Sequence, residues 1–191
     1  DTAELPSVMV DMEALSLLAD GAAARTALEP LVAAYGEWIA KQRMLTLDQQ
    51  RANARNGLMD KAEQAMKRIQ AGIDLLASDA QVFEAFRLAN QAMAVQAQRR
   101  SPDIYQGDKR PRWRLFQLAF VLLNLPSIAQ DDCPDRDTVE LIFFPTGGGK
   151  TEAYLGVIAF TLLLRRLRRR ELPDQGLGVA VMLRYTLRLL T

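Results

Sequence analysis

A glycine-rich loop at residues 144–151 carries the residue types that bind phosphate, in the order Phe-Pro-Thr-Gly-Gly-Gly-Lys-Thr. Glycine has no Cβ atom, so the backbone N–H groups of such a loop can wrap around phosphate oxygens. Lys150 can set its ammonium group against the β- and γ-phosphates, and the hydroxyl of Thr151 can bind Mg²⁺. The sequence therefore predicts a P-loop with ATP and Mg²⁺ as cofactors and with Lys150 and Thr151 in the catalytic roles. The residues expected to bind the nucleotide phosphates are Thr146, Gly147, Gly148, Gly149, Lys150 and Thr151.

Two apolar segments flank this loop and are expected to position it. Residues 138–143 and 177–184 are mostly apolar, as is typical of strands in a buried parallel sheet. Residues 151–170 between them form an apolar helical pattern, and the N-terminus of that helix would point at the bound phosphate. The order strand, P-loop, helix, strand predicts a βαβ unit with a right-handed crossover. The alternative is a glycine turn before a helix with an incidental lysine, and this order of elements argues against it.

The first hundred residues have a helical pattern. Apolar residues recur at close to helical spacing, Ala, Gln, Met and Arg are frequent, and β-branched residues are few. The Pro, Gly and charge content of residues 101–111 indicates a linker. We therefore expect a mostly α-helical module at residues 1–100, a linker at 101–111, and an α/β nucleotide-binding domain, incomplete in this chain, at 112–191.

The composition narrows the class of protein further. The chain has 24 Lys and Arg against 23 Asp and Glu, a net charge of +1, so overall charge indicates no partner. There is no histidine, and the single cysteine, Cys133, excludes an internal disulfide and favours the cytoplasm. The apolar stretches 115–125 and 154–164 are shorter than the ~20 residues that span a bilayer, so we expect no membrane partner. Because the chain starts at Asp1 and ends inside an apolar pattern, we expect a piece of a longer protein.

Three segments carry a family resemblance. They are residues 113–126 (Trp-Arg-Leu-Phe-Gln-Leu-Ala-Phe-Val-Leu-Leu-Asn-Leu-Pro), 143–156 (Phe-Phe-Pro-Thr-Gly-Gly-Gly-Lys-Thr-Glu-Ala-Tyr-Leu-Gly) and 181–191 (Val-Met-Leu-Arg-Tyr-Thr-Leu-Arg-Leu-Leu-Thr). Together they resemble the bacterial superfamily 2 helicases of the DISARM anti-phage system, the DrmA-like type. The resemblance implies the start of a RecA-like P-loop domain with a parallel sheet, in an ATP-dependent DNA helicase or translocase of phage defence. It also implies two partners, DNA and a subunit of a defence complex.

The resemblance assigns roles to residues outside the loop. Gln117 stands where such helicases place the glutamine that reads adenine, since an amide can donate to and accept from one base edge. Residues 185–189 resemble the segment that contacts the DNA phosphate chain. This likeness implies phosphate contacts, without sequence reading, for Arg184, Thr186 and Arg188. The alternatives are a surface amide at Gln117 and a helix-capping threonine at Thr186.

Two further groups of basic residues are candidates for DNA contact. Residues 165–170 are five arginines and one leucine, which would equally suit the solvated C-terminus of a helix. Basic and aromatic residues also alternate before and after the predicted linker, as on surfaces that bind single strands; a flank of the nucleotide site or a basic linker are the alternatives. The members of this second group are Arg99, Arg100, Tyr105, Lys109, Arg110, Arg112, Trp113 and Arg114.

Hydrolysis would need residues that this chain does not supply. Superfamily 2 helicases use an Asp-Glu motif and arginine fingers from a second domain for phosphoryl transfer, and neither can be assigned here. We therefore expect this chain to bind nucleotide weakly at best and not to hydrolyse it. Two other functions stay open: a P-loop NTPase that does not act on nucleic acid, and a helical partner-docking module with a regulatory nucleotide site.

Overall fold

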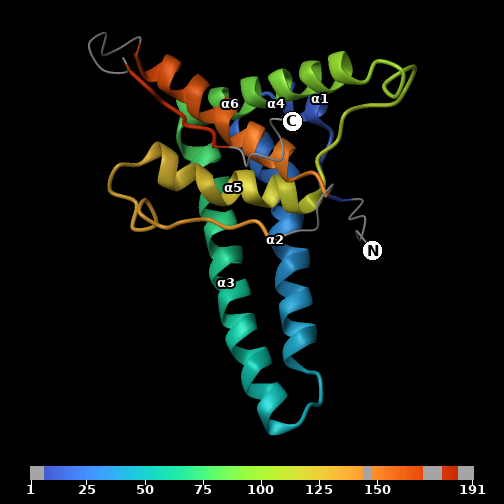
Figure 1. Cartoon of the computed structure of the whole chain (residues 1–191), viewed down its shortest axis with the longest axis vertical. Helices are drawn as coiled ribbons and strands as arrows, with labels where there is room; N and C mark the ends of the chain where they lie inside the picture. Colours follow the sequence, from blue (N-terminus) through green and yellow to red (C-terminus); the bar gives the residue numbers. More distant parts are fainter. Residues whose placement is uncertain (1–6, 144–147, 170–177, 185–191) are drawn as a thin grey trace.

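The computed structural model describes residues 7–143, 148–169 and 178–184. Within these residues the chain forms six α-helices, which Figure 1 shows in one view. In chain order they are α1 (Met12–Ser16), α2 (Gly21–Arg43), α3 (Gln49–Ser78), α4 (Ala80–Arg100), α5 (Leu115–Ala129) and α6 (Lys150–Arg169). Within residues 7–100 the helical prediction is confirmed by α1 to α4.

Aspartate side chains begin the first four helices. Asp11, Asp20, Asp48 and Asp79 each accept a hydrogen bond from backbone N–H groups in the first turn of α1, α2, α3 and α4 respectively. These N–H groups have no partner inside the helix, and a side-chain cap of this kind stabilises a helix by about 1 kcal/mol. The helix starts are therefore fixed locally by the sequence.

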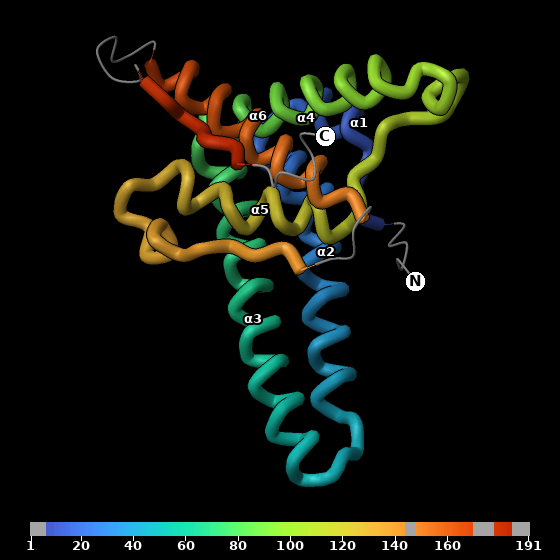
Figure 2. Tube along the Cα trace, viewed as in Figure 1, coloured from blue at the N-terminus to red at the C-terminus, as the bar shows by residue number. Residues whose placement is uncertain are grey.

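Helices α2 and α3 form an antiparallel hairpin that projects well beyond the other helices (Figures 1 and 2). In the distal part of the hairpin, beyond Leu31 on α2 and before Ile69 on α3, the buried residues are Ile39 and Met59. Farther out, Arg43 of α2 pairs with Asp60 and Glu63 of α3, so contacts within the hairpin hold its outermost turns. The proximal turns pack against the body of the molecule, mainly against α5.

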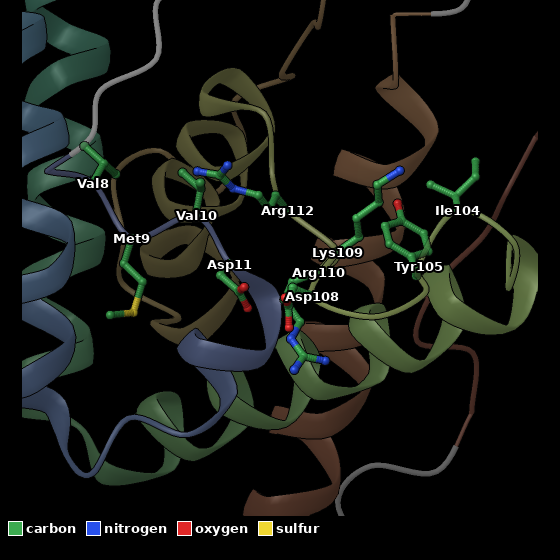
Figure 3. Close-up of a pocket in the computed structure, with 10 residues that line it drawn as sticks. All are labelled: Val8, Met9, Val10, Asp11, Ile104, Tyr105, Asp108, Lys109, Arg110 and Arg112. Carbon is green, nitrogen blue, oxygen red and sulfur yellow. The ribbon is translucent and has the colours of Figure 1, made fainter.

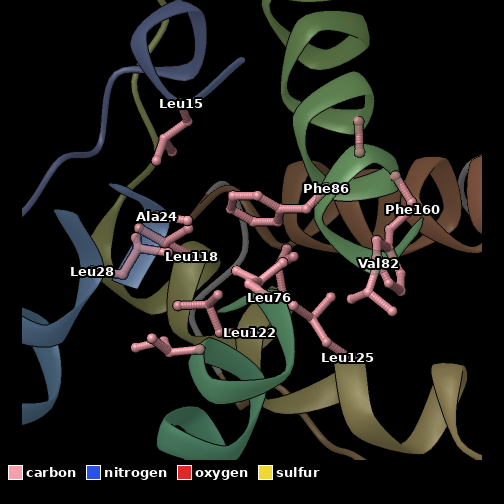
Figure 4. Packing of buried hydrophobic residues seen from close by; sticks show 14 of the residues in the cluster. Leu15, Ala24, Leu28, Leu76, Val82, Phe86, Leu118, Leu122, Leu125 and Phe160 are labelled. Atoms are coloured by element: carbon pink, nitrogen blue, oxygen red, sulfur yellow. The ribbon is translucent and has the colours of Figure 1, made fainter. Parts of the chain in front are cut away.

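One hydrophobic core joins helices from both halves of the chain (Figure 4). Helix α5 lies at its centre, where Leu118, Leu122 and Leu125 have no exposed surface. Phe86 of α4 and Phe160 of α6 pack into the same cluster. The core therefore combines side chains of the predicted helical module with side chains that follow the predicted linker.

The α/β prediction for residues 112–191 is wrong, because the described part of that range contains helices and no strand or sheet. The two predicted strands are residues 138–143 and 177–184, of which 138–143 and 178–184 are described. No described residue forms a ladder with their backbone N–H and C=O groups, and a strand exists only when a neighbour supplies those bonds. Three apolar side chains of the first segment are also largely exposed. They are Val139, Leu141 and Phe143, which are 92%, 81% and 93% exposed. The predictions of a βαβ unit and of the start of a RecA-like parallel sheet are therefore wrong for the described residues.

Ion pairs hold the first of these segments against a helix instead. The guanidinium of Arg68 in α3 lies 3.0 Å from the carboxylate of Asp135 and 2.5 Å from that of Glu140. The chain after α5 consequently crosses α3 on its way to the glycine loop (Figure 2). This route delivers the loop to the start of α6, where the sequence predicted a helix and the structure has one.

Candidate functional site

The described end of the glycine loop leads directly into α6. Thr146 and Gly147 lie outside the described residues, whereas Gly148, Gly149 and Lys150 are placed. Gly149 has φ = +86°, a left-handed conformation that side chains with a Cβ rarely adopt. Helix α6 begins at the next residue, so its first N–H groups and the positive end of its dipole lie at the loop. This is the local geometry in which helix N-termini bind phosphate.

The Gln117 side chain joins the loop to the start of α5. It is 4% exposed. Its Nε2 donates to the carbonyl oxygen of Gly149 at 2.8 Å, and its Oε1 accepts from the backbone N–H of Arg114 at 2.8 Å. The first bond crosses 32 residues of sequence, so two parts of the predicted site are brought together. The role of Gln117 in reading adenine stays a prediction.

Two arginines flank the loop. The guanidinium Nη1 of Arg114 donates to the carbonyl oxygen of Gly148 at 2.7 Å. Arg100, at the C-terminal end of α4, contacts the Glu152 carboxylate in the first turn of α6 at 3.2 Å. Guanidinium groups match the geometry of phosphate oxygens and keep their charge at all physiological pH values. The surroundings of the loop therefore favour an anion.

The sequence offered a flank of the nucleotide site as one alternative for Arg100 and Arg114, but it did not predict the contacts of Arg114 with Gly148 or of Arg100 with Glu152. Gln117 is the third residue of α5, and its Oε1 accepts from the backbone N–H of Arg114 at the N-cap. This bond is the glutamine half of a capping box, whereas the arginine side chain has no acceptor for the other half. That signal could have identified the start of α5 and, with it, the two side chains that reach the loop. Nothing in the spacing of Arg100 indicated its position.

A cleft of about 310 Å³ lies beside the loop, between it and helices α1 and α4. Met12 and Met93 line its apolar part, whereas Arg100 and Gln117 line it near Gly149. A site with one apolar part and one cationic part suits a ligand with both a planar apolar group and an anionic group, as a nucleotide has.

A second, more open pocket of about 600 Å³ shares Tyr105 and Arg112 with this cleft. Figure 3 shows Lys109 and Tyr105 on one side of it and Val8 on the other. Trp113, which belonged to the predicted basic and aromatic group, is not on this surface. It is 5% exposed, and its Nε1 donates to the buried Oδ1 of Asn90 at 2.7 Å. The tryptophan is therefore part of the core and unavailable for stacking on a nucleic-acid base.

The residues predicted to contact DNA are only partly described. Arg184 is exposed, and Thr186 and Arg188 lie outside the described residues, so their DNA contacts stay a prediction. In the basic run at the end of α6, Arg168 donates to the carbonyl oxygen of Ala129 and contacts the Asp79 carboxylate at 3.4 Å. This arginine ties α6 to the end of α5 and the start of α4, which is a structural role.

The described ranges show neither a metal-binding cluster nor a membrane-spanning helix. No group of three or more Cys, Asp or Glu side chains there is arranged to hold a metal ion. None of the six helices combines the length and apolar character needed to cross a membrane.

Comparison with known proteins identifies one relative. The chain is 38% identical over 177 residues to DISARM protein DrmA of Bacillus paralicheniformis. The match covers 86% of this chain and 16% of that protein, so the chain spans about a sixth of the length of its relative. No protein-family model matches the chain.

Proposed function

From the similarity to DISARM protein DrmA, we propose that this chain is the nucleotide-binding part of a DNA helicase or translocase that acts in defence against phage. In this proposal residues 146–151 bind the phosphates of ATP, Thr151 holds Mg²⁺, and the protein works in the cytoplasm. Hydrolysis requires an acidic motif and arginine fingers from a longer protein than this chain. DNA is held through its phosphates by Arg184, Thr186 and Arg188.

The observation that best supports the proposal is the geometry at Gly149. Its left-handed backbone precedes the first residue of α6, and its carbonyl oxygen is anchored by the buried Gln117. This end of the loop is held before a ligand binds, which reduces the ordering cost of binding at Gly149. The same loop carries Lys150 and Thr151, whose side chains match the requirements of a triphosphate and of Mg²⁺.

The experiment that tests nucleotide binding compares two lysine variants. We expect Lys150→Ala to weaken Mg-ATP binding at least tenfold in isothermal titration calorimetry, because a charged contact to phosphate contributes about 1.5–3 kcal/mol. The matched control is Lys67→Ala, which removes an exposed lysine of α3 paired with Glu63. Equal affinities of wild type and Lys150→Ala for Mg-ATP would exclude the proposed site.

Action on DNA has to be tested on a longer protein that contains this chain and supplies the residues needed for hydrolysis. The helicase proposal predicts that duplex or single-stranded DNA raises the rate of ATP hydrolysis, and that Arg184→Ala reduces this stimulation more than it reduces the basal rate. A rate unaffected by DNA would favour the alternative of an NTPase that does not act on nucleic acid.

A second candidate function, partner docking, is favoured by the tip of the α2–α3 hairpin. Met44, Leu45 and Leu58 at this tip are 83%, 50% and 61% exposed, and exposed apolar groups of this kind mark protein interaction sites. We expect the double variant Met44→Ser, Leu45→Ser to lose binding to a purified subunit of the defence complex while its affinity for Mg-ATP stays unchanged. Retained binding would place the partner elsewhere.

A further inference from the structure

The hydrogen bonds of Gln117 occupy the two groups that the resemblance assigns to adenine binding. An amide that reads adenine uses its oxygen as an acceptor and its nitrogen as a donor on one base edge. In Gln117 the oxygen is bonded to the Arg114 N–H and the nitrogen to the Gly149 carbonyl. With 4% of its surface exposed, the side chain cannot turn toward a base without breaking both bonds. Its geometry is that of a residue that positions the loop.

The cleft beside Gln117 has a surface suited to a base. Met12 of α1 and Met93 of α4 line it from the core, and because only 4% of each is exposed they present a small apolar area to a ligand. Methionine side chains are flexible and polarizable, and they make favourable contacts with aromatic rings. Tyr105 also lines this cleft and supplies an aromatic ring to stack on a base.

Gln96 supplies a second amide at this cleft. It lies on α4 three residues after Met93, on the same face of the helix, and it lines the cleft together with Gly149 and Gln117. Its side chain is exposed. No described residue forms a hydrogen bond with it, so both its donor and its acceptor are available to a ligand.

We propose that the purine base of the bound nucleotide lies in the cleft between α1, α4 and Tyr105, and that Gln96 forms the hydrogen bonds to its edge. Gln117 then acts as a positioning residue for the phosphate loop. The phosphates lie at the Gly149 end, near Arg100 and Arg114. This inference rests on the nucleotide site proposed above and assigns its base end to the helices that precede the loop in sequence.

The test separates base binding from phosphate binding by using two ligands, Mg-ATP and Mg-tripolyphosphate. Calorimetry of the whole chain gives the affinity of the wild type and of Gln96→Ala, Gln117→Ala and Gln91→Ala for each ligand. Gln91→Ala is the matched control, since Gln91 is an exposed glutamine of α4 that does not line the cleft.

We expect Gln96→Ala to weaken Mg-ATP binding about five- to tenfold, the effect of losing one or two hydrogen bonds, and to leave tripolyphosphate binding unchanged. Gln117→Ala should weaken both ligands by similar factors, and Gln91→Ala neither. The thermal unfolding midpoint of Gln96→Ala should equal that of the wild type, because the side chain is exposed.

Three outcomes would overturn the inference. In the first, Gln96→Ala binds Mg-ATP as the wild type does. In the second, Gln117→Ala weakens Mg-ATP alone, which would return base reading to Gln117. In the third, the wild type binds ATP no more tightly than tripolyphosphate. The base would then add nothing to the binding free energy, although the phosphate site would still be supported. A wild type that binds neither ligand would instead refute the proposed function, and this inference with it.

Discussion

At the scale of single residues, buried polar side chains connect the core to the loop. The Trp113 ring lies between α4 and α6: its Nε1 donates to Asn90 of α4, and a Cβ placed on Gly156 of α6 would come within 2.8 Å of the ring. Trp113 also immediately precedes Arg114, which contacts the loop at Gly148. The position of the tryptophan therefore helps to set the position of the site.

Asn90 gives the clearest test at this scale. We expect Asn90→Ala to lower the free energy of unfolding by about 1–3 kcal/mol, because the buried Trp113 N–H would lose its acceptor. Urea denaturation followed by tryptophan fluorescence measures this change. Asn53→Ala, at an exposed position of α3, is the control and should stay within about 0.5 kcal/mol of the wild type. Equal stabilities of the two variants would contradict the assigned role.

Single residues of the site were predictable from the sequence to different degrees. The loop pattern predicts Lys150 and Thr151 as site residues, and their roles stay predictions. The resemblance indicated Gln117, but not its hydrogen bond to Gly149. The free amide of Gln96 was not predictable, because its place depends on how α4 packs beside the loop. A contact between residues far apart in sequence leaves no local pattern in either segment.

At the scale of helices and strands, close backbone approach decides how α3 crosses α5. A Cβ built on Gly72 of α3 would lie 2.0 Å from the carbonyl oxygen of Leu122 in α5. The two helices can therefore be this close only with glycine at this position. Since Leu122 is at the centre of the core, the crossing fixes how α5 sits on the hairpin.

Two glycines of the same helix test this crossing. We expect Gly72→Ala to destabilise the protein by about 1–3 kcal/mol, because α3 and α5 must separate to admit the methyl group. Gly57→Ala is the matched change in the distal part of α3, where a Cβ would meet nothing within 4 Å, and it should stabilise by about 0.5–1 kcal/mol. Thermal unfolding followed by circular dichroism at 222 nm compares both with the wild type. A Gly72→Ala variant as stable as Gly57→Ala would contradict the close crossing.

Helices were more predictable than strands in this chain for a physical reason. A helix makes its hydrogen bonds within its own segment, and the aspartate caps and the helical spacing of apolar residues mark its start and its buried face. A strand depends on a partner elsewhere. The apolar run at residues 138–143 has the composition of a strand, and Arg68 instead holds Glu140 of that run beside α3.

At the scale of the whole molecule, the six described helices share one hydrophobic core, and we expect them to fold as one unit. Helices α1 to α4 contribute Leu15, Leu28, Leu76 and Phe86 to the cluster, and α5 and α6 supply the side chains packed against them. The domain boundary predicted at residue 100 therefore separates helices that share this core.

The fragment of residues 1–100 tests whether that division has physical meaning. We expect the whole chain to unfold in one cooperative urea transition by circular dichroism and by fluorescence. The fragment alone should show reduced helicity and a broad, non-cooperative transition, since it lacks α5 and leaves the apolar surface against α5 exposed to water. A fragment that unfolds as cooperatively as the whole chain would support an independent helical module.

The hairpin has a consequence for how the sequence can vary over evolution. In its outermost turns, Arg43 of α2 pairs with Asp60 and Glu63 of α3. These turns lie beyond Arg68, which contacts the chain after α5, so we expect their number not to be set by the body of the molecule. Removing or adding one matched turn on α2 and on α3 would change the reach of the arm by about 5.4 Å without altering the contacts at Gly72 or the nucleotide cleft. We therefore expect this arm to accept insertions and deletions of paired turns, whereas a single-residue shift in α5 would rotate its buried face out of the core.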